Sequence, residues 1–235
     1  MKAIEAIQLS KRFGRLEAVN KVSFVAERGE ILGLLGANGA GKTTLIKMLC
    51  AMLEPSGGEG WVNGCNIRSQ AKAIRHQIGY MSQAVSLLET LTVKENVVFY
   101  GRIQGMTRDE IERRWEGLSE LYHLGRHRDK LALELPSGVR QVLAFAIAIF
   151  HQPGILFLDE PTSGLDPMSR MEIWKQIYHL AYQGTTVVIS THYLDESYYC
   201  DRLLLMEDGK IKRDGSPESF DALTGGKGLQ QLFFM

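Results

Sequence analysis

The sequence contains little cysteine, and this scarcity argues against two classes of protein. Its three cysteines, Cys50, Cys65 and Cys200, are odd in number and far apart along the chain. Small secreted domains held by disulfide bonds usually carry an even number of cysteines, and zinc sites carry theirs at short, repeated spacings. We therefore expect free thiols and a reducing compartment, which the cytoplasm provides.

The sequence also lacks a long hydrophobic run and an excess of either charge. The longest apolar run, Val142 to Phe150, is far shorter than the ~20 residues that cross a bilayer. The opening residues, MKAIEAIQLSKRFG, carry no signal-peptide pattern, so we expect any membrane attachment to come through another chain. Lysine and arginine total 27, as do aspartate and glutamate, which gives no electrostatic reason to expect a nucleic acid partner.

One stretch, by contrast, combines a short apolar run with closely spaced glycines. Residues Ile31 to Leu35 are nearly all apolar, as in a parallel strand whose two faces are both covered. From Gly36 to Thr43 the residues follow the pattern G-x-x-x-x-G-K-[ST], and apolar residues return at helical spacing from Leu45. Such a loop turns its backbone N–H groups inward and binds the phosphates of a nucleotide. The expected binding residues are Gly36, Asn38, Gly39, Ala40, Gly41, Lys42, Thr43 and Thr44.

Two carboxylates later in the chain complete the pattern of a nucleoside triphosphatase. In the loop, Lys42 can reach the β- and γ-phosphates and the Thr43 hydroxyl is placed to ligate Mg²⁺. The apolar run at residues 155–158 then ends in Asp159 and Glu160. Such an enzyme needs one carboxylate to hold Mg²⁺ and a second to orient or deprotonate the attacking water. We assign these roles to Asp159 and Glu160 respectively.

The order of the predicted elements indicates an α/β fold with a mostly parallel sheet. Strands alternate with helices, ligands are expected at the carboxyl ends of the strands, and the first two strands form an antiparallel β edge. The chain is expected to be a single domain over 1–235, with a core of residues 1–83 and 153–235 and an inserted helical subdomain at 84–152. Strands are predicted at 4–9, 19–25, 31–35, 61–62, 78–81, 155–158, 186–190, 203–206 and 210–213, and helices at 93–103, 108–124 and 139–150.

These motifs, in this order, resemble the nucleotide-binding subunits of ABC transporters, which have a P-loop NTPase core. The resemblance covers essentially the whole chain and is carried by GANGAGKTT, by FLDEPTSGLDP, by Gln83 between them and by His192 after TTVVIST. It implies that ATP is the nucleotide, that Gln83 contacts Mg²⁺ and takes part in catalysis, and that His192 lies beside the γ-phosphate. Phe13 matches an aromatic residue that stacks on adenine, and Ser163 to Asp166 match a loop that contacts a second subunit.

Each of these assignments has a simpler alternative when it is taken alone. His192 would be a hydrogen-bonded polar residue after a strand, Gln83 an exposed amide, and Phe13 a residue that packs at a sheet edge. The presence of five motifs in the family order favours the functional interpretation.

One motif departs from the family pattern. The family signature, normally Leu-Ser-Gly-Gly before a helix, contacts the γ-phosphate bound to the opposing subunit. Aligned on residues 140–141, this chain reads Leu-Pro-Ser-Gly over residues 135–138. Pro136 has neither a hydroxyl nor an N–H group, whereas Ser137 and Gly138 lie where a helix start presents free N–H groups to the nucleotide. Either the chain hydrolyses ATP weakly as a homodimer, or a partner subunit supplies a regular signature.

The resemblance therefore implies an ATP-hydrolysing subunit, dimeric with itself or with another subunit, that powers a separate permease from the inner face of the cell membrane. The run LTVKENVVFYGRIQG and the ending LQQLFF resemble export-type ATPases more than importers. The helical insert is the expected docking surface, with Ala84 to Thr92 as its nearest segment. Three alternatives stay open: an importer ATPase, a soluble ABC protein of translation, repair or cluster assembly, and a regulatory subunit with weak hydrolysis, for which Pro136 argues.

Overall fold

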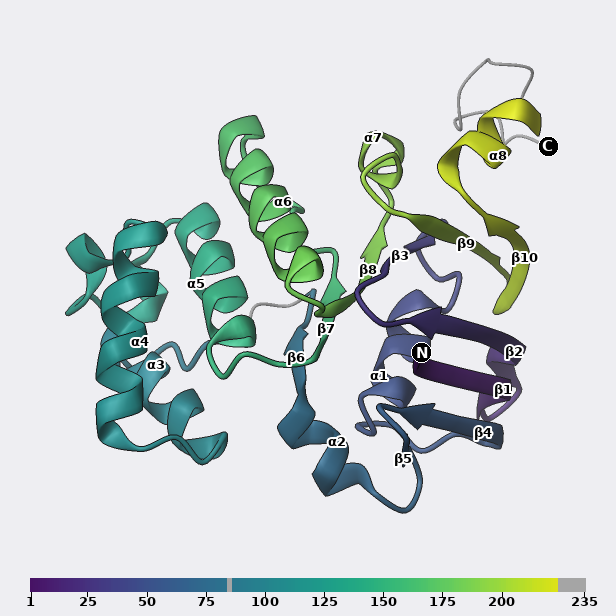
Figure 1. Ribbon diagram of the computed structural model, residues 1–235, viewed down its shortest axis with the longest axis horizontal. Helices are drawn as coiled ribbons and strands as arrows, with labels where there is room; N and C mark the ends of the chain where they lie inside the picture. The colour runs from purple at the N-terminus through teal and green to yellow at the C-terminus, as the bar shows by residue number, and fades with distance from the viewer. Residues whose placement is uncertain (84–85, 224–235) are drawn as a thin grey trace.

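Two β-sheets and the helices around them make up the part of the chain that the computed structural model describes, residues 1–83 and 86–223 (Figure 1). The strands are β1 (Lys2–Phe13), β2 (Leu16–Glu27), β3 (Ile31–Leu35), β4 (Gly57–Val62), β5 (Cys65–Asn66), β6 (Ile78–Met81), β7 (Ile155–Asp159), β8 (Thr186–Thr191), β9 (Arg202–Glu207) and β10 (Lys210–Gly215). The α-helices are α1 (Lys42–Leu49), α2 (Ala71–Gln77), α3 (Val93–Ile103), α4 (Arg108–Leu121), α5 (Ser137–Ile149), α6 (Pro167–Tyr182), α7 (Leu194–Ser197) and α8 (Pro217–Leu223).

The larger sheet has six strands in the order β10-β9-β3-β8-β7-β6, and all of its neighbouring pairs except β10-β9 are parallel. Successive side chains of a strand point to opposite faces, and here both faces are covered. On β7, Leu156 and Leu158 pack into a core with α5 and α6, whereas Ile155 and Phe157 pack into a second core with α1 and the N-terminal strands. This double burial explains the uninterrupted apolar runs and confirms the predicted mostly parallel sheet.

The N-terminal strands confirm the predicted antiparallel β structure, which forms a separate four-stranded sheet in the order β2-β1-β4-β5. The strand predicted at residues 61–62 was too short, because β4 already begins at Gly57. Its glycines permit close approach to β1: a Cβ on Gly58 would collide with the backbone of Gln8, next to a register shift in β1. Gly57, Gly58 and Gly60 therefore belong to strand β4.

The helices at residues 93–150 agree with the prediction except at the end of α4 and at both ends of α5, which runs from Ser137 to Ile149. Helix α3 begins at a capping box in which Thr92 Oγ1 accepts from the Glu95 amide at 3.2 Å and Glu95 Oε2 accepts from the Thr92 amide at 2.8 Å. Helix α4 ends at Leu121, before the left-handed His123 (φ +54°), and α5 begins earlier than predicted, at Ser137. Figure 1 shows α3, α4 and α5 gathered at one end of the molecule, opposite the N-terminal sheet.

Helix α2 was not predicted, because its short sequence carries no apolar period: Ile74 is the buried residue of this helix. Among the described residues, no helix is both long and apolar enough to cross a membrane. The predicted docking segment, residues 84–92, begins with two residues outside the described part of the chain, and the ending LQQLFF lies wholly outside it.

Candidate nucleotide-binding site

The predicted phosphate-binding, metal-binding and catalytic residues of this chain's own site lie at the carboxyl ends of four neighbouring parallel strands. The glycine loop follows β3, His192 follows β8, Asp159 ends β7 with Glu160 directly after it, and Gln83 comes shortly after β6. These strands are adjacent in the order β3-β8-β7-β6. Because parallel strands end at the same edge of a sheet, the fold brings together residues that are far apart in the sequence.

The loop after β3 is held between two hairpins, and this close packing explains two of its glycines. A Cβ on Gly36 would collide with the carbonyl oxygen of Met206 in β9, and a Cβ on Gly41 (φ +102°) with that of Ala18 in β2. The Gly209 amide also donates to the carbonyl oxygen of Ala40 at 3.1 Å. Asn38 and Gly39 are exposed at the tip of the loop, and Thr43 and Thr44 lie half-buried in the first turn of α1.

Lys42 is buried beside the loop, with only 5% of its surface exposed. Its Nζ atom donates to the carbonyl oxygens of Gly36 at 2.7 Å and Ala37 at 3.1 Å. Burial lowers the pKa of Lys42, and the negative charges of Glu160 and Asp159 oppose that shift. The ammonium group therefore lies at the loop, near both carboxylates, where a phosphate would share its charge.

Asp159 combines one bonded oxygen with one unsatisfied oxygen. The residue is 1% exposed, and its Oδ1 accepts a hydrogen bond from Ser190 Oγ at 2.6 Å. Its Oδ2 is buried and accepts no hydrogen bond from any described residue. A buried carboxylate oxygen without a partner is costly, and a bound cation would satisfy it. The residue thus fits the predicted Mg²⁺ site, to which Thr43 and Gln83 would contribute further oxygen atoms.

Glu160 lies at the centre of the three predicted catalytic residues. Its Oε2 accepts from Gln83 Nε2 at 3.1 Å and lies 3.2 Å from His192 Nδ1. Its backbone is left-handed (φ +53°), an uncommon conformation for glutamate, and its amide donates to both the carbonyl and the hydroxyl oxygen of Ser190 at 3.1 Å. The backbone bonds therefore fix the turn that brings Glu160 to Gln83 and His192.

The remaining predicted positions, Phe13 and the start of α5, lie away from this edge of the sheet. Phe13, at the end of β1, is 48% exposed, with Lys11 Nζ 5.3 Å from its ring centroid. It does not pack in the core, and its stacking on adenine stays a prediction. Pro136 forms the N-cap of α5 without a side-chain capping bond, and Ser137 and Gly138 are the first two residues of the helix.

Gln141, used above only to align the signature, also belongs to the site. It is 6% exposed, and its Nε2 donates to the carbonyl oxygens of Pro161 at 2.9 Å and Glu160 at 3.4 Å. The amide thereby joins the helix that carries the signature to the turn that carries Glu160. The available sequence signal was a polar residue directly before the apolar run of α5.

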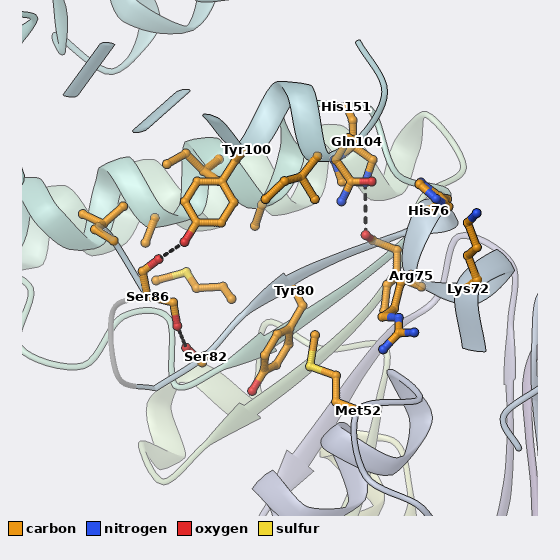
Figure 2. Close-up of a pocket in the computed structure, with 17 residues that line it drawn as sticks. Met52, Lys72, Arg75, His76, Tyr80, Ser82, Ser86, Tyr100, Gln104 and His151 are labelled. Carbon is orange, nitrogen blue, oxygen red and sulfur yellow. Dashed lines mark hydrogen bonds between the residues drawn. The ribbon is translucent and has the colours of Figure 1, made fainter. Parts of the chain in front are cut away.

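A second concave site lies beside the first, where α2 and β6 face α3 and α5 (Figure 2). This groove, a cavity of about 560 Å³, has an apolar lining that includes Met52, Ile103 and Ile147. Figure 2 shows Lys72, Arg75 and His76 at one end. No aspartate or glutamate is among the described residues that line it.

Two buried polar atoms of residues that line this groove have no hydrogen-bond partner within the part of the chain that the structure describes. The hydroxyl of Tyr80 and the Nδ1 atom of His151 are buried without a hydrogen bond to any described residue. The groove thus offers apolar surface and the positive charge of Lys72 and Arg75 to whatever covers it.

The sequence of this chain is similar to a known protein family and to several known proteins. A sequence model of the family described as "ABC transporter" matches residues 19–163. The "Probable multidrug ABC transporter ATP-binding protein YbhF" of Escherichia coli K12 is 42% identical over 219 residues, which are 93% of this chain and 38% of that protein. The "Nod factor export ATP-binding protein I" of Rhizobium sp. N33 is 37% identical over 218 residues, 92% of this chain and 72% of that protein.

Among solved structures, one described as the ATP-binding subunit of an ABC transporter superimposes with a TM-score of 0.90 at 28% identity. The match covers 99% of this chain and 98% of that one. The chain therefore matches a complete solved subunit, whereas it spans well under half the length of the E. coli relative.

Proposed function

This chain belongs to the ABC transporter family, and from that premise we propose that it binds ATP and hydrolyses it to drive a separate membrane permease. The observation that carries the proposal is the meeting of Gln83, Glu160 and His192 at one carboxylate oxygen, at the sheet edge where the phosphate-binding loop emerges. The names of the two relatives, a multidrug transporter protein and a Nod factor export protein, support export as the direction of transport.

In this proposal the residues of the loop hold the nucleotide and those of the neighbouring strands act on water. Lys42 binds the β- and γ-phosphates, and Glu160 accepts a proton from the attacking water while Gln83 and His192 hold its carboxylate in place. Thr43, Gln83 and Asp159 would hold Mg²⁺, which would neutralise phosphate charge when bound. The Glu160 amide already donates a hydrogen bond to Ser190, which holds the turn at Glu160 in place. Little of the free energy of ATP binding is therefore needed to form this turn.

The complete site is proposed to need a second subunit, the same chain or a different one. Pro136 and Ser137 are exposed, and a Cβ on Gly138 would lie 3.6 Å from Leu165. The signature and the loop at residues 163–166 are thus neighbours, available to one partner surface. The absent hydroxyl and N–H of Pro136 favour a second candidate, a regulatory subunit that hydrolyses ATP weakly.

The groove of Figure 2 is proposed as the docking site of the permease, which would hold the chain at the inner face of the cell membrane. Its apolar lining suits a short amphipathic segment, and the cations of Lys72 and Arg75 with no lining carboxylate suit an acidic residue on that segment. The groove borders Ser82, next to Gln83, so an occupant would lie close to the catalytic residues.

The hydrolytic role of Glu160 is tested by Glu160→Gln. Loss of a general base should lower ATP turnover by about 10²–10⁴-fold, and the variant should retain ATP in a dimer that size-exclusion chromatography detects. Glu172→Gln, an exposed position on α6, is the matched control and should hydrolyse ATP like the wild type. Undiminished turnover in Glu160→Gln would remove Glu160 from its role, and no turnover in the wild type with any nucleotide would remove the proposed activity.

The docking role of the groove is tested by Lys72→Glu combined with Arg75→Glu. The tagged variant should lose a multi-span membrane protein that the wild type retains during purification from detergent-solubilised membranes. Lys210→Glu with Lys212→Glu on β10 reverses as much charge away from the groove and should retain it. A ribosomal protein as the sole partner would contradict the transport role. Equal retention of the membrane protein by both double variants would contradict the docking role of the groove.

A further inference from the structure

Outside the residues considered so far, one carboxylate is fully buried close to His192. Glu196, on the short helix α7, is 1% exposed. Its Oε2 accepts a hydrogen bond from Thr191 Oγ1 at 2.8 Å, whereas its Oε1 accepts none from any described residue. Placing a carboxylate in such surroundings is costly unless a positive charge compensates it.

The compensating charge comes from α6. Arg170 Nε lies 3.6 Å from Glu196 Oε1, too far for a hydrogen bond but within reach of an ion pair. The guanidinium carbon of Arg170 also lies 4.5 Å from the ring centroid of Tyr193. Arg170 is in the first turn of α6, its amide bonded to the carbonyl oxygen of Asp166 at 3.0 Å. The pair therefore ties α7 to the helix that starts at the loop of residues 163–166.

His192 lies between the residues that this pair holds. The Thr191 hydroxyl donates to Glu196 and at the same time accepts from the Tyr193 amide at 2.9 Å, so it closes the turn around His192 from both sides. The rings of His192 and Tyr193 lie 4.2 Å apart at an interplanar angle of 35°. Thus Glu196 holds the backbone of the turn through Thr191, and Arg170 lies over the aromatic ring against which the imidazole packs.

We propose that Arg170 and Glu196 are positioning residues that hold His192 at Glu160 and link its position to the loop of residues 163–166. The inference rests on the proposed function of His192, but neither residue is among those expected to bind the nucleotide. Replacing Glu196 with a neutral residue leaves Arg170 without its countercharge, and replacing Arg170 leaves the buried carboxylate without its own. Either change should let the imidazole move away from Glu160 Oε2, which lies 3.2 Å from it.

The kinetic test uses Glu196→Gln, with Glu172→Gln as its control on α6. Glu172 forms an ion pair of the same length, 3.6 Å, with Lys175, but on the surface. We expect Glu196→Gln to lower kcat by about 10- to 100-fold, as loss of an orienting partner does, with KM for ATP within about twofold of wild type. The control should change neither value. A KM that rises as much as kcat falls would indicate general damage to the site and would overturn the proposal.

Combination with His192→Ala identifies the residue through which Glu196 acts. If Glu196 acts through His192, adding Glu196→Gln to His192→Ala should lower kcat no further. Arg170→Met should behave likewise, and Arg170→Lys should recover part of the rate because it restores the charge. Losses that multiply in the double variants would overturn the proposal.

A spectroscopic measurement separates this inference from the proposed activity. In ¹⁵N-histidine NMR spectra, the His192 signal, assigned by its loss in His192→Ala, should shift in Glu196→Gln and stay in place in Glu172→Gln. This readout needs no ATP turnover, so an inactive wild type would contradict the proposed function alone. A His192 signal unmoved by Glu196→Gln would contradict the positioning role even in an active enzyme.

Discussion

The loop after β3 and the start of α5 are both expected to bind phosphate, yet they are built in opposite ways. The loop lies between two hairpins, and Lys42, 5% exposed, is bonded to the carbonyl oxygens of Gly36 and Ala37. At the start of α5, Pro136 and Ser137 are exposed and the N-cap makes no side-chain bond. The chain itself fixes the first geometry, whereas the second is left for a partner subunit to complete.

This difference explains why the departure from the family pattern occurs where it does. Proline is tolerated at a helix start, whose first N–H groups have no intrahelical partner in any case. Pro136 therefore costs the fold little and would affect only an assembled dimer. A comparable change in the loop, such as a side chain on Gly36, would collide with β9 in the monomer.

Of the changes that test this contrast, the largest expected effect comes from making the start of α5 resemble the family pattern. Pro136→Ser with Ser137→Gly restores a hydroxyl and an N–H group facing the opposing nucleotide. Because one charge-stabilising donor is worth about 2.7–4 kcal/mol, and Ser137 and Gly138 already supply part of it, we expect turnover by the homodimer to rise about tenfold or more. Steady-state ATPase assays over a range of protein concentrations measure the change.

ATP affinity of the monomer is the control for that experiment, because Lys42 and the glycine loop are untouched. It should equal that of the wild type in equilibrium binding. An unchanged or lower turnover would mean that the existing Ser137 and Gly138 suffice, or that a partner with a regular signature forms the natural dimer.

A smaller effect is expected at Gln141, which joins the helix that carries the signature to the turn that carries Glu160. Gln141→Leu keeps the size of the side chain but removes the amide that donates to the carbonyl oxygen of Pro161. The Glu160 carbonyl oxygen loses its longer bond and keeps the Ser163 amide as a donor at 3.2 Å. Losing such a buried bond at Pro161 costs about 1–3 kcal/mol in the free energy of unfolding. Urea unfolding measures this loss. Gln176→Leu, where a half-buried amide reaches only the Glu172 side chain at 3.5 Å, should stay within about 0.5 kcal/mol. Equal losses in the free energy of unfolding of Gln141→Leu and Gln176→Leu would show that the hydrogen bonds of Gln141 contribute nothing to stability.

The sequence predicted the part of the site that local patterns specify. The apolar runs of β3, β7 and β8 end at the loop, at Asp159 and shortly before His192, so strand order alone brings these residues to one edge. The fold class followed from the same runs. The roles of the site residues remain predictions, but their close approach is a property of the fold.

The remaining features depend on contacts that no local pattern reveals. Helix α2 has one buried residue, so its sequence shows no apolar period, and Gly58 belongs to a strand because β1 passes close to it. Glu196 resembles any acidic residue of a short surface helix until α6 brings Arg170 to it. Residues that act through other residues are therefore the ones that only the tertiary structure could identify.

The smallest expected effect concerns the other end of α5, which contrasts with its exposed start. His151, just beyond Ile149, is half-buried in the groove, with its Nε2 atom 3.0 Å from the carbonyl oxygen of Ile78. Burial lowers its pKa, and the charges of Arg114 and His76 act in the same direction against the raising effect of that hydrogen bond. As the pH falls below the unfolded-state pKa of about 6.5, the unfolded chain therefore gains the proton first and the folded state loses stability.

That loss should be absent above the unfolded-state pKa and should grow until the folded-state pKa is reached. His151→Gln cannot take up the proton and can still donate to Ile78, so its free energy of unfolding should fall less than that of the wild type between about pH 7.5 and pH 5.5. Urea unfolding at both pH values measures the difference, with His179→Gln on the exposed side of α6 as the control. Equal losses in wild type and His151→Gln would mean that this end of α5 is as open to solvent as its start, which would remove the contrast between a closed and an open end of the same helix.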